Sequence, residues 1–139
     1  WKSNEDLHNK SFDLSNFAKI SKIKNINLIS LQLNDEEDIK KNNFKITPFT
    51  QLGLENNLYN TAKIMKHLDL IITCDTSICH LSGSIGVKTW LLLKKVPDWR
   101  WLIKNEFWYN DFLIFHQKYE FKWTDVFNDV YNNLIKIIK

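Results

Sequence analysis

One short segment, Cys74 to His80, holds the residue types best suited to chemistry. Thr76 and Ser77 carry hydroxyl groups that can donate to phosphate oxygens, and His80 follows one helical turn later on the same face. A helix that begins here also offers unpaired backbone N–H groups to an anion. Asp75 would repel a diphosphate unless its carboxylate turns to backbone amides or sugar hydroxyls. We expect a diphosphate site, although an ordinary N-cap explains the same residues equally well on local chemistry.

The pair Cys74 and Cys79, with His80 next to it, also suggests a metal site. Structural zinc needs four ligands, and two cysteines around a strand-to-helix turn are more often small buried apolar residues. We therefore expect neither a metal nor a cofactor. The segment also lacks a glycine-rich dinucleotide fingerprint and a Walker loop, which removes the usual sequence support for hydride transfer and for nucleotide hydrolysis.

Alternating helices and strands must position these residues. The spacing predicts a helix over Leu58–His67 and then a buried strand over Leu68–Thr73. A second helix follows, which Thr76 or Ser77 caps and which runs through Ile85 and stops at Gly86. A second buried strand covers Thr89–Leu93. Such alternation predicts an α/β fold with a Rossmann-like, open parallel sheet and helices on both faces. Ligands of such sheets bind beyond the carboxyl ends of the strands, where Asp75 follows a predicted strand.

Weaker patterns complete the fold. They predict a helix over Asp13–Ile23 with Asp13 or Ser15 as its cap, a strand within Asn25–Leu33, a solvated loop at Asp35–Asp38, a short strand near Phe44–Ile46, a further strand at Phe112–Phe115 and a closing helix over Trp123–Ile138.

Composition sets the class of protein. The 139 residues are 44% hydrophobic and 25% charged, which suits one globular domain covering residues 1–139. The net charge of +3 comes from scattered lysines, so we expect no nucleic-acid partner. There is no long apolar run and no signal-peptide pattern, and we expect a cytoplasmic protein.

The segment from Leu68 to Gly83 resembles bacterial glycosyltransferase family 9, the heptosyltransferase-like enzymes, in the version attached to tetratricopeptide-repeat proteins. The resemblance continues over nearly the whole chain. It includes Trp1-Lys2-Ser3-Asn4, His8, Lys10, Ser11, Ser30-Leu31-Gln32, Thr61-Ala62, Trp90-Leu91-Leu92-Leu93, Val96-Pro97-Asp98-Trp99-Arg100-Trp101-Leu102, Trp108-Tyr109 and Phe115-His116-Gln117.

This resemblance implies the GT-B architecture, in which two Rossmann-like domains face each other across a cleft. The chain would be the C-terminal, donor-binding half, without the N-terminal acceptor domain. Thr76, Ser77 and His80 would hold the donor diphosphate, and Asp75 would cap the helix or touch the sugar. A loop over residues 1–11 would close on the phosphates and bring Ser3, His8 and Lys10, the last as a positive charge. The loop with Asp98, Trp99 and Arg100 would lie beside the cleft.

The implied activity is metal-free transfer of a hexose or heptose from a nucleotide-sugar donor to an acceptor hydroxyl. The general base would belong to the absent domain, so we expect this half alone to bind donor with little or no turnover. A non-catalytic nucleotide-sugar-binding or protein-interaction module is the alternative. Ser3 favours it, because the family usually has glycine there, and a Cβ hinders close approach to phosphate. The family also usually has alanine at Cys79 and arginine at His116.

The aromatic residues between Trp99 and Tyr109 have several interpretations: Trp99, Trp101, Phe107, Trp108 and Tyr109 could stack on a base or a sugar, bind a partner or enter a membrane surface. We expect packing in the core or at an interface, either with the missing domain or in a homo-oligomer. Peripheral association with the inner membrane stays open. The acceptor, the sugar and the nucleotide cannot be named from the sequence.

Overall fold

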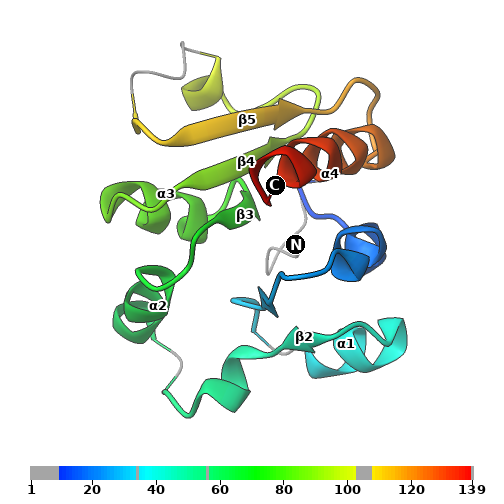
Figure 1. Ribbon diagram of the computed structural model, residues 1–139. Coiled ribbons are helices and arrows are strands. Elements are labelled where there is room, and N and C mark those ends of the chain that lie inside the picture. The colour runs from blue at the N-terminus through cyan, green and yellow to red at the C-terminus, as the bar shows by residue number, and fades with distance from the viewer. Residues whose placement is uncertain (1–9, 34, 56, 103–107, 139) are drawn as a thin grey trace.

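The computed structural model describes residues 10–33, 35–55, 57–102 and 108–138. Ser3, His8 and Phe107 lie outside these ranges. The helices and strands alternate along the chain (Figure 1). Their bounds are 3-10 helix η1 (Leu14–Ala18), η2 (Ile20–Lys22), β1 (Leu28–Ile29), α1 (Glu36–Asn42), β2 (Ile46–Thr47), η3 (Phe49–Leu52), α2 (Leu58–Met65), β3 (Ile71–Cys74), α3 (Ser77–Ser84), β4 (Thr89–Leu93), η4 (Trp99–Trp101), β5 (Phe112–His116) and α4 (Thr124–Ile138).

A three-stranded parallel sheet in the order β3-β4-β5 forms the centre of the fold, with helices on both of its faces (Figure 1). All five residues of β4 are buried. Trp90 and Leu92 pack towards α4, whereas Leu91 and Leu93 lie in a cluster with Cys79 of α3, because successive side chains of a strand point to opposite faces. A sheet covered on both faces therefore needs a continuous apolar strand, as the sequence predicted.

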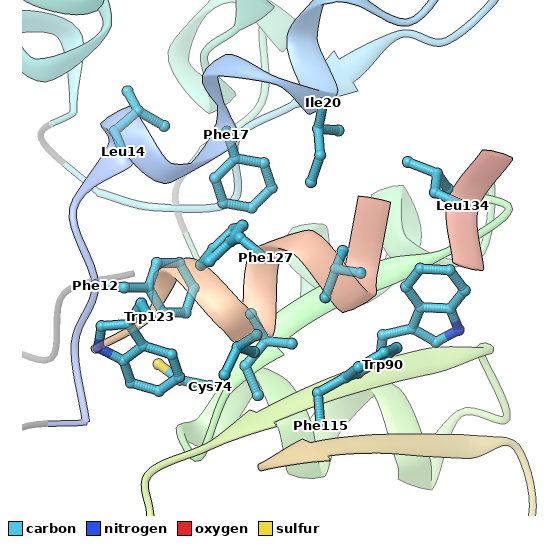
Figure 2. Packing of buried hydrophobic residues seen from close by; sticks show 13 residues of the cluster. Phe12, Leu14, Phe17, Ile20, Cys74, Trp90, Phe115, Trp123, Phe127 and Leu134 are labelled. Atoms are coloured by element: carbon cyan, nitrogen blue, oxygen red, sulfur yellow. The ribbon is translucent and has the colours of Figure 1, made fainter. Parts of the chain in front are cut away.

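The largest core cluster joins the sheet to α4 and to the segment before β1 (Figure 2). Phe12, Phe17 and Phe127 form edge-to-face and tilted ring pairs, and Trp123 contacts Phe12 edge-on with ring centroids 5.3 Å apart. Val130 is fully buried beside them. These contacts hold the chain near Lys10 at the sheet, which matters for the site described below.

The predicted helix over Asp13–Ile23 is wrong in type, since the segment forms η1 and η2. Leu14, Phe17, Ile20 and Ile23 are spaced by three, and three residues per turn is the period of a 3-10 helix rather than an α-helix. The predicted cap is confirmed: the Asp13 side chain accepts a hydrogen bond from the Ser15 N–H at 2.8 Å.

The predicted solvated loop at Asp35–Asp38 is also wrong, because α1 begins at Glu36. Its first turn carries three acidic residues and its last turn carries Lys40 and Lys41, an order that the helix dipole favours. Asp35 itself is buried and accepts a hydrogen bond from the Ser30 hydroxyl. Burial raises the pKa of the Asp35 carboxyl above its usual value.

A second sheet contains only β1 and β2, which pair in parallel through Leu28 with Ile46 and Ile29 with Thr47. The strand predicted within Asn25–Leu33 is therefore present but much shorter than its apolar run. In the described part of the chain, β1 and β3 share no ladder. No helix in those same residues is long and apolar enough to cross a membrane.

Candidate functional site

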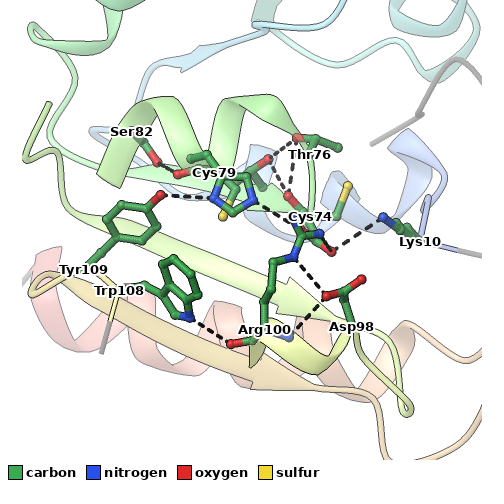
Figure 3. Close-up of polar contacts among 12 residues, drawn as sticks. Lys10, Cys74, Thr76, Cys79, Ser82, Asp98, Arg100, Trp108 and Tyr109 are labelled. Carbon is green, nitrogen blue, oxygen red and sulfur yellow. Dashed lines mark hydrogen bonds and ion pairs between the residues drawn. The ribbon is translucent and has the colours of Figure 1, made fainter. Parts of the chain in front are cut away.

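Asp75 lies at the centre of a charged cluster directly after β3, and its side chain is 7% exposed. Three basic side chains surround its carboxylate (Figure 3): Lys10 Nζ lies 3.5 Å from Oδ2, an Arg100 terminal nitrogen lies 3.7 Å from Oδ2, and His80 Nε2 lies 3.8 Å from Oδ1. These three residues come from the segment before η1, from η4 and from α3. The fold thus gathers on one carboxylate three side chains that the sequence placed far apart.

A hydrogen bond and a ring contact fix the orientation of His80. Its Nδ1 lies 3.0 Å from the Tyr109 hydroxyl, and its ring stacks on Trp101 with centroids 5.6 Å apart and planes 19° apart. When the tyrosine donates to Nδ1, the proton of a neutral imidazole is on Nε2, the nitrogen that faces Asp75. His80 then presents a donor to the charged cluster.

Gly83 makes room for Tyr109. A Cβ built at Gly83 would lie 2.3 Å from Tyr109 Cδ1, far inside van der Waals contact, so the ring rests on the α3 backbone where only glycine fits. Burial raises the pKa of the Tyr109 hydroxyl above its usual value. Trp101 is buried, and its ring stacks both on His80 and on Phe112.

The turn around η4 aims Arg100 at Asp75. Asp98 caps η4 by accepting from the Arg100 N–H at 3.1 Å, and it also accepts from Arg100 Nε at 2.9 Å. These contacts, first of all the backbone hydrogen bond, lower the pKa of the Asp98 carboxyl. Trp108 Nε1 donates to the Arg100 carbonyl at 3.0 Å and closes the turn from the other side (Figure 3).

The amino end of α3 lies beside this cluster. Thr76 occupies the N-cap position with extended backbone angles but makes no side-chain capping bond, and Ser77 is exposed. The expected capping role of these hydroxyls, or of Asp75, is therefore not what the structure shows. The Thr76 hydroxyl lies 3.4 Å from the Thr73 hydroxyl and from the Cys74 carbonyl. The first N–H groups of a helix have no partner inside the helix, so this end is suited to an anion.

A cavity of about 630 Å³ opens next to the same helix end, and Asp75, Thr76 and Ser77 form part of its lining. A much smaller hollow lies between Lys10, Asp75 and Asp98. Both concave surfaces reach Asp75, at the carboxyl end of β3, the edge at which parallel sheets bind ligands.

Both cysteines are free thiols and buried, in agreement with the small-apolar interpretation. Burial raises the pKa of the Cys79 thiol well above its usual range. Within the described residues, no group of three or more His, Cys, Asp or Glu side chains is arranged to hold a metal ion.

Most of the site residues expected from the sequence lie together. Lys10, Asp75, His80, Asp98 and Arg100 form one connected cluster, with Thr76 and Ser77 at its edge. Trp99 is 65% exposed and has no part in this network of contacts, and Ser3 and His8 lie outside the described residues.

Sequence reasoning missed two residues that shape the cluster. In the sequence, Tyr109 is one of several aromatic residues and part of the matched pair Trp108-Tyr109, and Gly83 is the end of a matched segment. Neither carries a local signal for its role, because the Tyr109 hydroxyl reaches His80 from 29 positions away.

Comparison with protein-family models, curated proteins and solved structures gives no match to this chain.

Proposed function

We propose that this chain is the donor-binding domain of a glycosyltransferase that resembles family 9 and binds the diphosphate of a nucleotide-sugar at the amino end of α3. The observation that carries the proposal is the convergence of Lys10, His80 and Arg100 on Asp75 beside that helix end. The motif around Asp75-Thr76-Ser77 supports it from the sequence side.

The basic groups around Asp75 reduce the repulsion between its carboxylate and a diphosphate. Lys10 and Arg100 bring two positive charges against the negative charges of Asp75 and Asp98. The helix end adds a partial positive charge of about half a unit. Asp75 thus holds the three basic side chains in place before the ligand binds. The oxygens of the ligand then replace the Asp75 carboxylate in some of these contacts.

The same groups suit the chemistry of glycosyl transfer. Negative charge grows on the leaving diphosphate as the glycosidic bond to the donor breaks, and fixed N–H groups and cations stabilise that charge most in the transition state. Lys10, Arg100 and an Nε2–H on His80 would supply these donors from the protein. The Thr76 and Ser77 hydroxyls would contact the non-bridging oxygens.

Calorimetric titration with uridine, guanosine, cytidine and adenosine diphosphates, each with and without an attached sugar, tests the proposal. We expect one nucleotide to bind, and its affinity to fall as salt rises because the contacts are ionic. Lys10→Met and Thr76→Val should each weaken that binding by about tenfold, the effect of losing one charge-assisted contact of roughly 1.5 kcal/mol.

Lys136→Met is the matched control, because it removes the same charge from the last turn of α4. It should leave binding unchanged. If no nucleotide binds, or if Lys136→Met weakens binding as much as Lys10→Met does, the proposed site is wrong.

A further inference from the structure

The short helix η4 turns its three residues to three different sides, because a 3-10 helix has three residues per turn. Trp101 is buried, packs in a core cluster and stacks on His80. Arg100 reaches to the carboxylate of Asp75. The remaining side belongs to Trp99, whose surface is 65% exposed.

The outward side of η4 extends beyond Trp99 to a second apolar residue, Leu102. Residues three apart lie above one another in a 3-10 helix, and the Leu102 N–H donates to the Trp99 carbonyl at 3.1 Å. Leu102 is 70% exposed, and Val96, three residues before Trp99, is 65% exposed. We call Val96, Trp99 and Leu102 the outer ridge. Figure 1 shows η4, in yellow-green, at the top of the molecule above β5.

Hydrogen bonds hold the turn that carries the outer ridge. Asp98 accepts from the N–H and the Nε of Arg100, and Trp108 Nε1 donates to the Arg100 carbonyl (Figure 3). Trp108 is itself 45% exposed beside the turn. The exposed apolar side chains thus stand on a turn whose shape is already set, so a partner that binds them has little backbone ordering to offset.

Basic residues accompany the outer ridge. Lys94 and Lys95 connect the end of β4 to this turn, and Lys95 is exposed. The acidic residue of the turn, Asp98, contacts Arg100 and is thereby compensated. An apolar surface with lysine beside it favours a partner that is apolar inside and anionic at its boundary.

The small size of the outer ridge favours a bilayer over a folded protein as this partner. A stable interface between proteins buries about 800 Å² on each side, from roughly 20–30 residues. Three side chains on one turn cover much less than that. Trp and aliphatic side chains next to lysine are, in contrast, the composition that enters the boundary between lipid headgroups and acyl chains.

We infer that the outer ridge inserts into the surface of a bilayer that carries anionic headgroups. The side chains of Trp99 and Leu102 leave water there, and the ammonium group of Lys95 stays at the level of the lipid phosphates. Arg100 keeps its contact with Asp75, because it lies on another side of η4. This inference is independent of the proposed donor site.

Sedimentation of the full chain of 139 residues with lipid vesicles tests the inference. The vesicles contain phosphatidylcholine and phosphatidylglycerol in equal parts, and we expect the chain to bind them. Trp99→Gln and Leu102→Gln should each weaken binding about tenfold, because each keeps one apolar side chain out of the bilayer. Lys95→Met should weaken it about fivefold, and pure phosphatidylcholine vesicles should bind more weakly than the mixture, because both changes remove attraction between lysine and anionic lipid.

Leu58→Gln is the matched control, because Leu58 is a similarly exposed leucine on α2. Urea unfolding checks that all variants keep the stability of the original chain. The inference is wrong if the chain does not bind the vesicles, or if Leu58→Gln weakens binding as much as Leu102→Gln does. It is also wrong if the chain forms a dimer in ultracentrifugation that Trp99→Gln dissociates, since the outer ridge is then a contact between copies. No nucleotide is present, so this result is separate from the nucleotide titration above.

Discussion

The ring of Tyr109 lies on the backbone of Gly83 so closely that a Cβ at Gly83 would come within 2.3 Å of it. This contact places the Tyr109 hydroxyl 3.0 Å from His80 Nδ1. A residue without a side chain therefore sets the position of a hydroxyl, and the hydroxyl sets which nitrogen of His80 faces Asp75.

Tyr109→Phe should remove the donor to His80 Nδ1 while leaving the ring in place. We expect the His80 imidazole to lose its preference for the Nε2–H form, and the free energy of unfolding to fall by about 1 kcal/mol for one hydrogen bond. The ¹⁵N shifts of the His80 ring report the tautomer directly. Tyr119→Phe is the control, since Tyr119 is exposed; an unchanged His80 tautomer in Tyr109→Phe would contradict the assigned role.

Gly83→Ala should push the Tyr109 ring away from α3, because the new Cβ overlaps three ring atoms. Overpacking of this kind costs about 1–3 kcal/mol of stability, measured by urea unfolding. In the Tyr109→Ala background the same change should cost much less, since the overlapping ring is gone. Equal losses of stability in both backgrounds would show that the Tyr109 ring does not restrict residue 83 to glycine.

Asp75→Asn should raise affinity for inorganic pyrophosphate about fivefold, which corresponds to the roughly 1 kcal/mol between two unit charges 4 Å apart in water. If Asp75 touches sugar hydroxyls, affinity for the nucleotide-sugar should gain less than affinity for the free nucleoside diphosphate. Calorimetry on both ligands separates the two effects. Asp129→Asn removes a charge from an exposed pair with Lys118 and should change neither.

Acid should loosen the η4 turn through Asp98. Its pKa is lowered in the folded protein, so between the folded and unfolded pKa values the unfolded chain binds more protons. The stabilisation is therefore complete above the unfolded value of about 3.9 and is lost as pH falls through the folded value. Urea unfolding between about pH 6 and pH 3 should show this loss of stability. In Asp98→Asn the free energy of unfolding should depend less steeply on pH. An identical pH dependence of the free energy of unfolding in Asp98→Asn would contradict this role of Asp98.

The sequence by itself determined the elements whose apolar pattern is long or continuous. The buried run Thr89–Leu93, the helix that ends the chain and the strand-to-helix turn at Asp75 could be predicted because the spacing of apolar residues is a local property. The short apolar segments near the start were harder. Spacing by three at Leu14, Phe17 and Ile20 suits a 3-10 helix but is short enough to be compatible with an α-helix as well, and all three residues pack in one core cluster with Phe127.

Only the tertiary structure decided how the site is built. The sequence indicated Lys10, Asp75, His80 and Arg100 separately, but their distances depend on how β3, η4 and the first segment pack, and packing is a property of the whole core. The role of Tyr109 carried no local signal for the same reason. Local interactions set the type of each element, whereas contacts between residues distant in sequence set what those elements place together.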